Sequence, residues 1–207
     1  MTPAEISPLA VVCRWAAGFF LAPPDHAALA LYQEPAGAAL LAALETEPAL
    51  AAPIQDLRAM TAPGADLAAA ADRLAVAHSG AFLIGGRRSA PPYASVWLSP
   101  RGLLNQEPAR AMNRLLAAVD LGLPEEASEP PDHLSFQLNL LAELVDRENG
   151  GLAVPLTAQG FLRDHLLTWL PDFAAACRRL REPFFYAGLA AALNEYLNQK
   201  NNENIKA

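Results

Sequence analysis

The sequence predicts an all-α fold, a helical bundle of roughly ten helices. Runs rich in alanine and leucine place apolar residues three and four positions apart, which is the spacing of one face of a helix. Prolines, glycines and aspartates that end or cap helices separate these runs. No segment alternates apolar and polar residues over the length of a strand, and Val96-Trp97-Leu98 is too short to support a sheet.

Composition and charge exclude several classes of protein. With 207 residues, 53% of them apolar and 18% charged, the chain can bury one sizeable core or two small ones and is not disordered. Its formal net charge of −7 argues against nonspecific binding to nucleic acid or to anionic membranes. No stretch reaches the roughly twenty uncharged apolar residues of a membrane span, so no stable membrane insertion is expected.

Two further features predict a cytoplasmic, reduced protein. The N-terminal segment lacks the basic region of a secretory signal, and Arg14 interrupts its apolar run. Cys13 and Cys177 lie far apart and unaccompanied, which predicts two buried thiols instead of a disulfide or a zinc site.

In the first half of the chain, helix starts and stops can be read from proline, glycine and aspartate. Thr2-Pro3-Ala4-Glu5 has the form of a capping box, and the helix behind it ends before Pro23-Pro24. Asp25 is placed to cap the next helix. Further helices are expected over 36–46, 53–61, 65–84 and about 105–119.

In the second half, an acidic, proline-rich stretch at 120–131 predicts a hinge. Asp132 is placed to cap a helix that closes at Asn149-Gly150-Gly151 and carries one apolar stripe. The stripe consists of Leu134, Leu138, Leu141 and Val145.

The last two helices complete the predicted domain. Thr157 starts a helix that Pro171 must kink or restart, because proline lacks the amide donor. Pro183 opens a final helix that runs to about Leu197. The chain is therefore expected to form one domain, 1–207, with an N-terminal subdomain of about 1–119, the hinge 120–131, a C-terminal subdomain of about 132–198 and a mobile tail 199–207.

The usual signatures of catalysis are missing from the sequence. It holds no phosphate loop, no G-x-S-x-G nucleophile elbow and no H-E-x-x-H metal helix. Gly85-Gly86-Arg87-Arg88 is interpreted as a helix-ending turn with solvated arginines. Asp-His pairs occur at 25–26, 132–133 and 164–165, but adjacent residues on a helix point about 100° apart and do not form a two-ligand face. No enzyme and no metal site are predicted.

An acidic stretch and an aromatic loop stand out instead. From Leu115 to Asp146 the chain has seven acids and no lysine or arginine; they are Asp120, Glu125, Glu126, Glu129, Asp132, Glu143 and Asp146. The loop PPYASVWLSPRG, 91–102, has prolines that favour an extended backbone and aromatic rings with polar tips. Together they would form a groove suited to a peptide in which arginines precede an apolar run. The alternative is a solvated acidic face and a loop that packs on the core.

Four blocks of sequence resemble the TorD/DmsD family, cytoplasmic chaperones dedicated to molybdopterin-dependent redox enzymes. The blocks are PPYASVW at 91–97, EPPDHL at 129–134, HLLTWLPDFAAACRRL at 165–180 and EPFFYAGLAAAL at 182–193. The resemblance implies an all-helical fold, a tendency to form domain-swapped homodimers and no enzymatic turnover. It further implies binding of the twin-arginine signal peptide on a cofactor-free reductase of the trimethylamine N-oxide or dimethyl sulfoxide type, so that the molybdenum cofactor is inserted before export.

The resemblance also implies which residues bind. A PPY-x-S box falls on Pro91, Pro92, Tyr93 and Ser95, with Trp97 beyond it, and an acidic box on Glu129, Pro130, Asp132 and His133. Arg14 and Phe82 match a first-helix arginine and an aromatic residue before the glycine turn. We expect Glu129 and Asp132 to pair with the arginines of the peptide and His133 to order the hinge. Tyr93, Trp97 and Phe82 would receive the apolar segment of the peptide.

Two other interpretations stay open, and so does a cofactor. One alternative is a nucleotide-binding hydrolase with Asp132-His133 as its base; the other is a helical assembly or regulatory protein without a signal-peptide role. The family resemblance implies a link to guanine nucleotides, although no residue pattern places such a site, and no other cofactor is expected.

Overall fold

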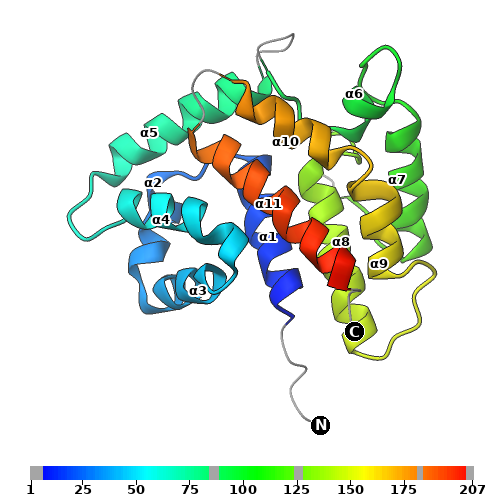
Figure 1. The fold of residues 1–207 in the computed structure, drawn as a ribbon, viewed down its shortest axis with the longest axis horizontal. Coiled ribbons are helices and arrows are strands. Elements are labelled where there is room, and N and C mark those ends of the chain that lie inside the picture. Colours follow the sequence, from blue (N-terminus) through cyan, green and yellow to red (C-terminus); the bar gives the residue numbers. More distant parts are fainter. Residues whose placement is uncertain (1–6, 84–88, 124–127, 181–183, 204–207) are drawn as a thin grey trace. The chain divides into compact units, whose positions relative to one another are not determined.

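The structure, a computed structural model, describes residues 7–83, 89–123, 128–180 and 184–203, and these are predominantly helical (Figure 1). The helices are α1 (Pro8–Leu21), α2 (His26–Ala30), η1 (Leu31–Gln33), α3 (Pro35–Glu45), η2 (Pro48–Leu50), α4 (Ala51–Met60), α5 (Leu67–His78), η3 (Ser79–Leu83), α6 (Ala94–Leu98), α7 (Glu107–Ala118), α8 (Leu134–Asn149), α9 (Ala158–Phe161), η5 (Leu162–Leu166), α10 (Leu170–Arg178) and α11 (Phe184–Glu203). Within the described ranges, β-type pairing is confined to an isolated bridge between Tyr93 and His133. The predicted all-α class is confirmed.

Several helix ends follow from the residues that the sequence places there. The Asp25 carboxylate accepts a hydrogen bond from Ala28 N at 2.7 Å and caps α2, as predicted. Thr157 Oγ1 accepts from Gly160 N at 3.0 Å and caps α9. Helix α10 starts at Leu170, so Pro171 sits in its first turn, where a missing amide donor is tolerated. The predictions on 2–5, 85–88 and 183, and those on Glu125 and Glu126, lie outside the described residues.

Two predicted helix boundaries were wrong, the cap of α8 and the end of the last helix. Asp132 does not cap α8; His133 does, its Nδ1 accepting from Ser135 N at 3.2 Å, because the Asp132 carboxylate is bonded to Ser95 instead. In the loop 91–102 the backbone is extended at Tyr93, directly after the two prolines, and residues 94–98 then form the single-turn helix α6.

The final helix does not end near Leu197 but continues to Glu203. The Gln159 side-chain amide donates to both the backbone oxygen (3.1 Å) and the side-chain oxygen (2.6 Å) of Asn201, which fixes the last turns of α11. Residues 199–203 are therefore helical; residues 204–207 lie outside the described part of the chain.

The chain divides into two compact units, each made of separate segments. Unit 1 comprises Met1–Ala17, Pro92–Asp172 and Asn198–Ala207, and unit 2 comprises Gly18–Pro91 and Phe173–Leu197. This division differs from the predicted one, because the expected hinge at 120–131 lies inside a single stretch of unit 1. The helices on either side of it are tied together: Arg147 of α8 donates to the backbone oxygen of Val119 at the end of α7 (2.7 Å).

In unit 1, α6 packs on α7 and α8 packs on α9 (Figure 1). The apolar stripe predicted for α8 is buried, and Leu140 and Leu144 beside it are buried too. Trp169 is fully buried, and its indole donates to the side-chain oxygen of Gln137 at 3.2 Å. Helix α8 is thus enclosed by apolar neighbours over more than one face, which a single stripe does not predict.

In unit 2, α3 packs on α4 and α2 packs on α5. Its interior contains a cluster of aromatic rings formed by Phe20, His78, Phe82, Phe173 and Tyr186. Among the residues that are described, no single helix combines the length and apolarity of a membrane span; only His26–Gln33 and Pro35–Glu45 taken together reach them, and an 80° bend separates the two.

Candidate functional site

The PPY-x-S box and the acidic box meet in unit 1. Leu134 N donates to Pro92 O at 2.8 Å and Ala94 N donates to Asp132 O at 3.2 Å, on either side of the bridge between Tyr93 and His133. We call residues 92–95 and 129–134 the box junction. Two segments about forty positions apart in the chain are therefore neighbours in space, held by backbone hydrogen bonds that do not depend on side-chain identity.

Asp132 anchors this junction from inside. Its side chain is 0% exposed, and its Oδ2 accepts from Ser95 N at 2.7 Å, at the start of α6. Its other carboxylate oxygen has no hydrogen-bond partner among the residues described. A carboxylate that is buried and already bonded to α6 is closed to an incoming arginine in this arrangement. Its geometry is that of a positioning residue for α6.

Glu129 is the carboxylate of the junction that reaches solvent. It is half-buried and accepts a hydrogen bond of 2.5 Å from the Tyr93 hydroxyl. Burial and this hydrogen bond raise the pKa of Tyr93, so the phenol stays protonated and acts as a donor. The Tyr93 ring also lies edge-on to the imidazole of His133, with the ring centres 5.0 Å apart. Tyr93 therefore holds Glu129 at the surface of the junction.

Ser95 and Trp97 belong to α6. Ser95 is fully buried, and its hydroxyl accepts from Gln106 N at 3.1 Å, which ties α6 to the start of α7. Trp97 is half-buried. Among the prolines, Pro92 is buried in the junction and Pro130 accepts from His133 N at 3.0 Å.

The other predicted binding residues lie outside the box junction. Arg14 pairs with Asp146 near the C-terminal end of α8, with Nη2 2.6 Å from Oδ2, and Glu143 is 3.9 Å away. The acidic stretch is thus not a single rim, because its last two acids are taken up by this ion pair. Phe82 and Pro91 belong to unit 2, and the Phe82 ring is buried in the aromatic cluster of that unit.

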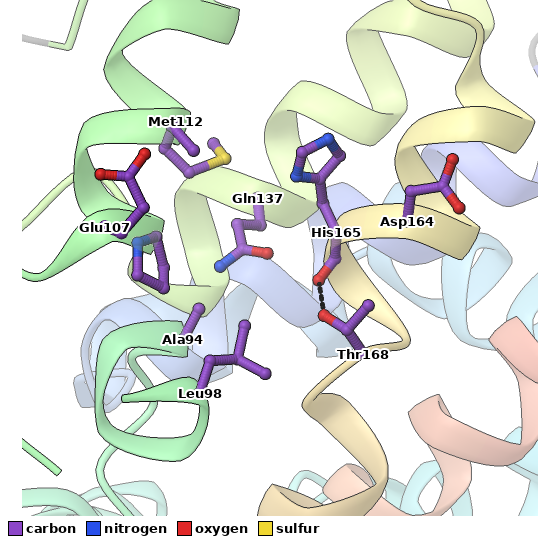
Figure 2. A pocket seen from close by; sticks show the side chains of 10 residues that line it. Ala94, Leu98, Glu107, Met112, Gln137, Asp164, His165 and Thr168 are labelled. Atoms are coloured by element: carbon purple, nitrogen blue, oxygen red, sulfur yellow. Dashed lines mark hydrogen bonds between the residues drawn. The ribbon is translucent and has the colours of Figure 1, made fainter. Parts of the chain in front are cut away.

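A pocket that sequence reasoning missed adjoins the junction (Figure 2). It has a volume of about 310 Å³ and lies between α6, α7, α8 and η5. Its lining consists of Ala94, Leu98, Glu107, Pro108, Ala111, Met112, Gln137, Asp164, His165 and Thr168. Ala94 belongs to the junction itself, and the Gln137 amide donates to the backbone oxygen of Asp132 at 2.8 Å. The junction therefore builds one wall of this pocket.

The charge of the pocket lining is negative. Its charged residues are Glu107 and Asp164, which stand on opposite sides in Figure 2, with no lysine or arginine among the ten. Hydrogen bonds from Arg114 and Arg110 hold the pKa of Glu107 below its usual range, and one from Arg163 does so for Asp164. Both carboxylates are therefore ionised near neutral pH, and their arginine partners are exposed.

His165 contributes a neutral ring to the same lining. It stacks on Phe161 with the ring centres 5.5 Å apart, and burial lowers its pKa. The dipeptide Asp164-His165 was visible in the sequence, but nothing there predicts that η5 is wound more widely than an α-helix or that both residues line a pocket. In the part of the chain that is described, no three histidine, cysteine or acidic side chains gather as metal ligands.

Comparisons with known proteins agree on one family. The family model described as nitrate reductase delta subunit matches residues 43–175. The chain is 40% identical to the chaperone protein TorD of Psychrobacter sp. over 164 residues, which is 77% of this chain and 67% of that protein. It is 40% identical to the TorD chaperone of Vibrio cholerae (strain O395) over 124 residues, 57% of this chain and 56% of that protein. The TorD chaperone of Ferrimonas balearica is 35% identical over 164 residues, 78% and 74% of the two chains.

A solved structure supports the fold alone. The crystal structure of a candidate redox enzyme maturation protein from Archaeoglobus fulgidus superposes with a TM-score of 0.53. The alignment covers 92% of this chain and 93% of that one, at 19% sequence identity.

Proposed function

Because this chain belongs to the TorD/DmsD family of redox-enzyme maturation chaperones, we propose that it binds the twin-arginine signal peptide of a molybdopterin-dependent reductase. The chain is a chaperone and not an enzyme, because the relatives that it matches are named chaperone proteins. In this proposal it holds the cofactor-free reductase in the cytoplasm until the molybdenum cofactor is inserted, and the client is of the trimethylamine N-oxide or dimethyl sulfoxide reductase type.

The observation that carries the proposal is the convergence of the two boxes around Glu129. A guanidinium group binds a carboxylate through two parallel hydrogen bonds, and Glu129 is a half-buried carboxylate with one short bond to a neutral phenol. An arriving arginine would replace or join the Tyr93 hydroxyl as donor. The half-buried Trp97 on α6 offers an apolar face to the residues that follow the arginines.

The buried members of the boxes act indirectly in this account. Asp132 fixes α6 and His133 caps α8, so each keeps Glu129 and Trp97 in place without touching the peptide. Substitutions at Asp132 or His133 should therefore weaken peptide binding only to the extent that they destabilise the fold.

The test is calorimetric titration with a synthetic peptide in which two arginines precede an apolar run. Glu129→Gln should weaken binding severalfold, because a guanidinium group that replaces the Tyr93 hydroxyl gains the difference between a charge-assisted and a neutral hydrogen bond, about 1 kcal/mol. Glu45→Gln, which alters a similarly exposed carboxylate in unit 2, is the matched control and should bind as the wild type does. Equal affinity of Glu129→Gln and wild type would reject Glu129 as the arginine partner. Equal affinity for a peptide with both arginines replaced by glutamine would reject leader recognition altogether.

A further inference from the structure

One wall of the pocket beside the junction is an apolar surface that extends into solvent. Leu98 lines the pocket and is 46% exposed, while Pro108, Ala111 and Met112 of α7 continue the wall. The connection from α6 to α7 carries Leu103 and Leu104, which are 46% and 44% exposed. Single exposed leucines are ordinary, but three within seven positions, one of them in the pocket lining, favour an apolar binding surface.

The base of the pocket holds a fixed polar group. Gln137 is 1% exposed, its side-chain oxygen accepts from Trp169 and its nitrogen donates to the backbone oxygen of Asp132. These two bonds determine which way the amide points. One amide hydrogen is left over from these two bonds, and Gln137 lines the pocket.

The charges of the pocket suit a cation. Glu107 and Asp164 flank it, and the basic residues that bind them lie outside the lining. All of these ion pairs are more than half exposed, and pairs of that kind contribute little free energy. A cationic side chain of a guest can therefore take the place of Arg110, Arg114 or Arg163 at small cost.

We infer that this pocket is a peptide subsite, which takes one large apolar side chain while a neighbouring arginine or lysine of the same peptide pairs with Glu107 or Asp164. Gln137 donates a hydrogen bond to the peptide backbone at that point. A volume of about 310 Å³ lies at the lower end of ligand pockets, which suits a side chain and its backbone and not a whole helix. The inference rests on the proposed function, since the peptide concerned is the signal peptide.

The experiment fills the pocket from α7. Ala111→Phe places a ring in its lining, and Ala117→Phe adds the same ring at an exposed position of the same helix that does not line this pocket. Each protein is titrated with two synthetic leader peptides, one with leucine directly after the two arginines and one with alanine in its place. Circular dichroism confirms that both variants remain helical.

The wild type should bind the leucine peptide about tenfold or more tighter than the alanine peptide, as expected for burial of one large apolar side chain. Ala111→Phe should bind both peptides with the weaker affinity, and Ala117→Phe should behave as the wild type. A second pair of variants tests the charges without enlarging a side chain. Glu107→Gln with Asp164→Asn should lower affinity severalfold, whereas Glu45→Gln with Asp56→Asn in unit 2 removes the same charge and should not.

The outcomes separate the two proposals. If the wild type binds neither peptide, the signal-peptide function fails, and this inference with it. If the wild type binds but Ala111→Phe still distinguishes leucine from alanine, the pocket does not receive that side chain, while the proposed function stands.

Discussion

Removing the Asp132 carboxylate should destabilise the fold before it affects recognition. Asp132→Ala leaves Ser95 N, in a residue that is itself fully buried, without the acceptor that it has at 2.7 Å. The backbone oxygen of Asp132, which accepts from Ala94 and Gln137, is unaffected by the change. The perturbation is therefore confined to one charge-assisted hydrogen bond in a dry environment.

The magnitude follows from that single bond. A buried donor left without a partner costs about 1–3 kcal/mol. Against this, alanine relieves the burial of a carboxylate whose second oxygen is unpartnered, which offsets part of the cost. We expect a net loss of about 2 kcal/mol in the free energy of unfolding, or about 4–8 °C in Tm for a chain of this size. Asp132→Asn keeps an acceptor for Ser95 N, so its free energy of unfolding should lie between those of Asp132→Ala and the wild type.

The assay is urea unfolding followed by circular dichroism, together with peptide titration well below the Tm of the variant. Asp132→Asn should retain peptide affinity within about twofold, because its side chain is closed to the peptide. An Asp132→Ala protein that unfolds at the same urea concentration as the wild type, yet no longer binds the peptide, would refute this reasoning. It would show that Asp132 contacts the peptide directly.

Two further predictions concern Tyr93 and His165. Tyr93→Phe removes only the hydrogen bond to Glu129 and should lower the free energy of unfolding, measured in urea, by about 1–2 kcal/mol. Tyr93→Ala also removes a buried ring and should lower it by about 3–5 kcal/mol. Equal losses in the two variants would show that the ring packs loosely. Burial lowers the pKa of His165 in the folded state below the 6.5 of the unfolded chain, so the unfolded state binds the proton more readily. The neutral His165 ring is therefore compatible with the fold above pH 6.5, and the free energy of unfolding decreases as the pH falls below that value. His165→Gln should therefore flatten the change of unfolding free energy between about pH 7.5 and pH 5.5, where the carboxylates Glu107 and Asp164 stay ionised; an unchanged slope would assign the pH dependence to other histidines.

Much of the fold was predictable because its signals are local. Asp25 and Thr157 cap helices through their own side chains, and Pro171 restricts the backbone at its own position. The end of α11 was not predictable in the same way, because the residue that fixes it, Gln159, is forty-two positions away from Asn201. The division into units also depends on distant contacts, such as the hydrogen bond from Arg147 to Val119 across the acidic stretch.

The site shows the same limit. The two boxes could be recognised as blocks of sequence, but their residue types did not reveal which side chains would form the hydrogen bonds that join the two boxes. Asp132 and Glu129 are chemically alike and three positions apart, yet one is fully buried against Ser95 and the other half-buried against Tyr93. The residues that line the pocket come from four elements spread between Ala94 and Thr168. No helical or strand periodicity in the sequence indicates that these residues lie together.

The carboxylates that this surface offers to a peptide are all engaged before the peptide arrives. Glu129 accepts from Tyr93, Glu107 from two arginines and Asp164 from Arg163. In the proposed complex an arginine of the signal peptide therefore exchanges one donor for another, and the gain is the difference between two hydrogen bonds and not a whole one. Burial of the exposed leucines breaks no existing interaction with the protein, so the full free energy of removing their apolar surface from water contributes to binding. The apolar run of the signal peptide should therefore supply most of the affinity, and the arginines, through their two-pronged geometry, should supply register and discrimination against other leaders.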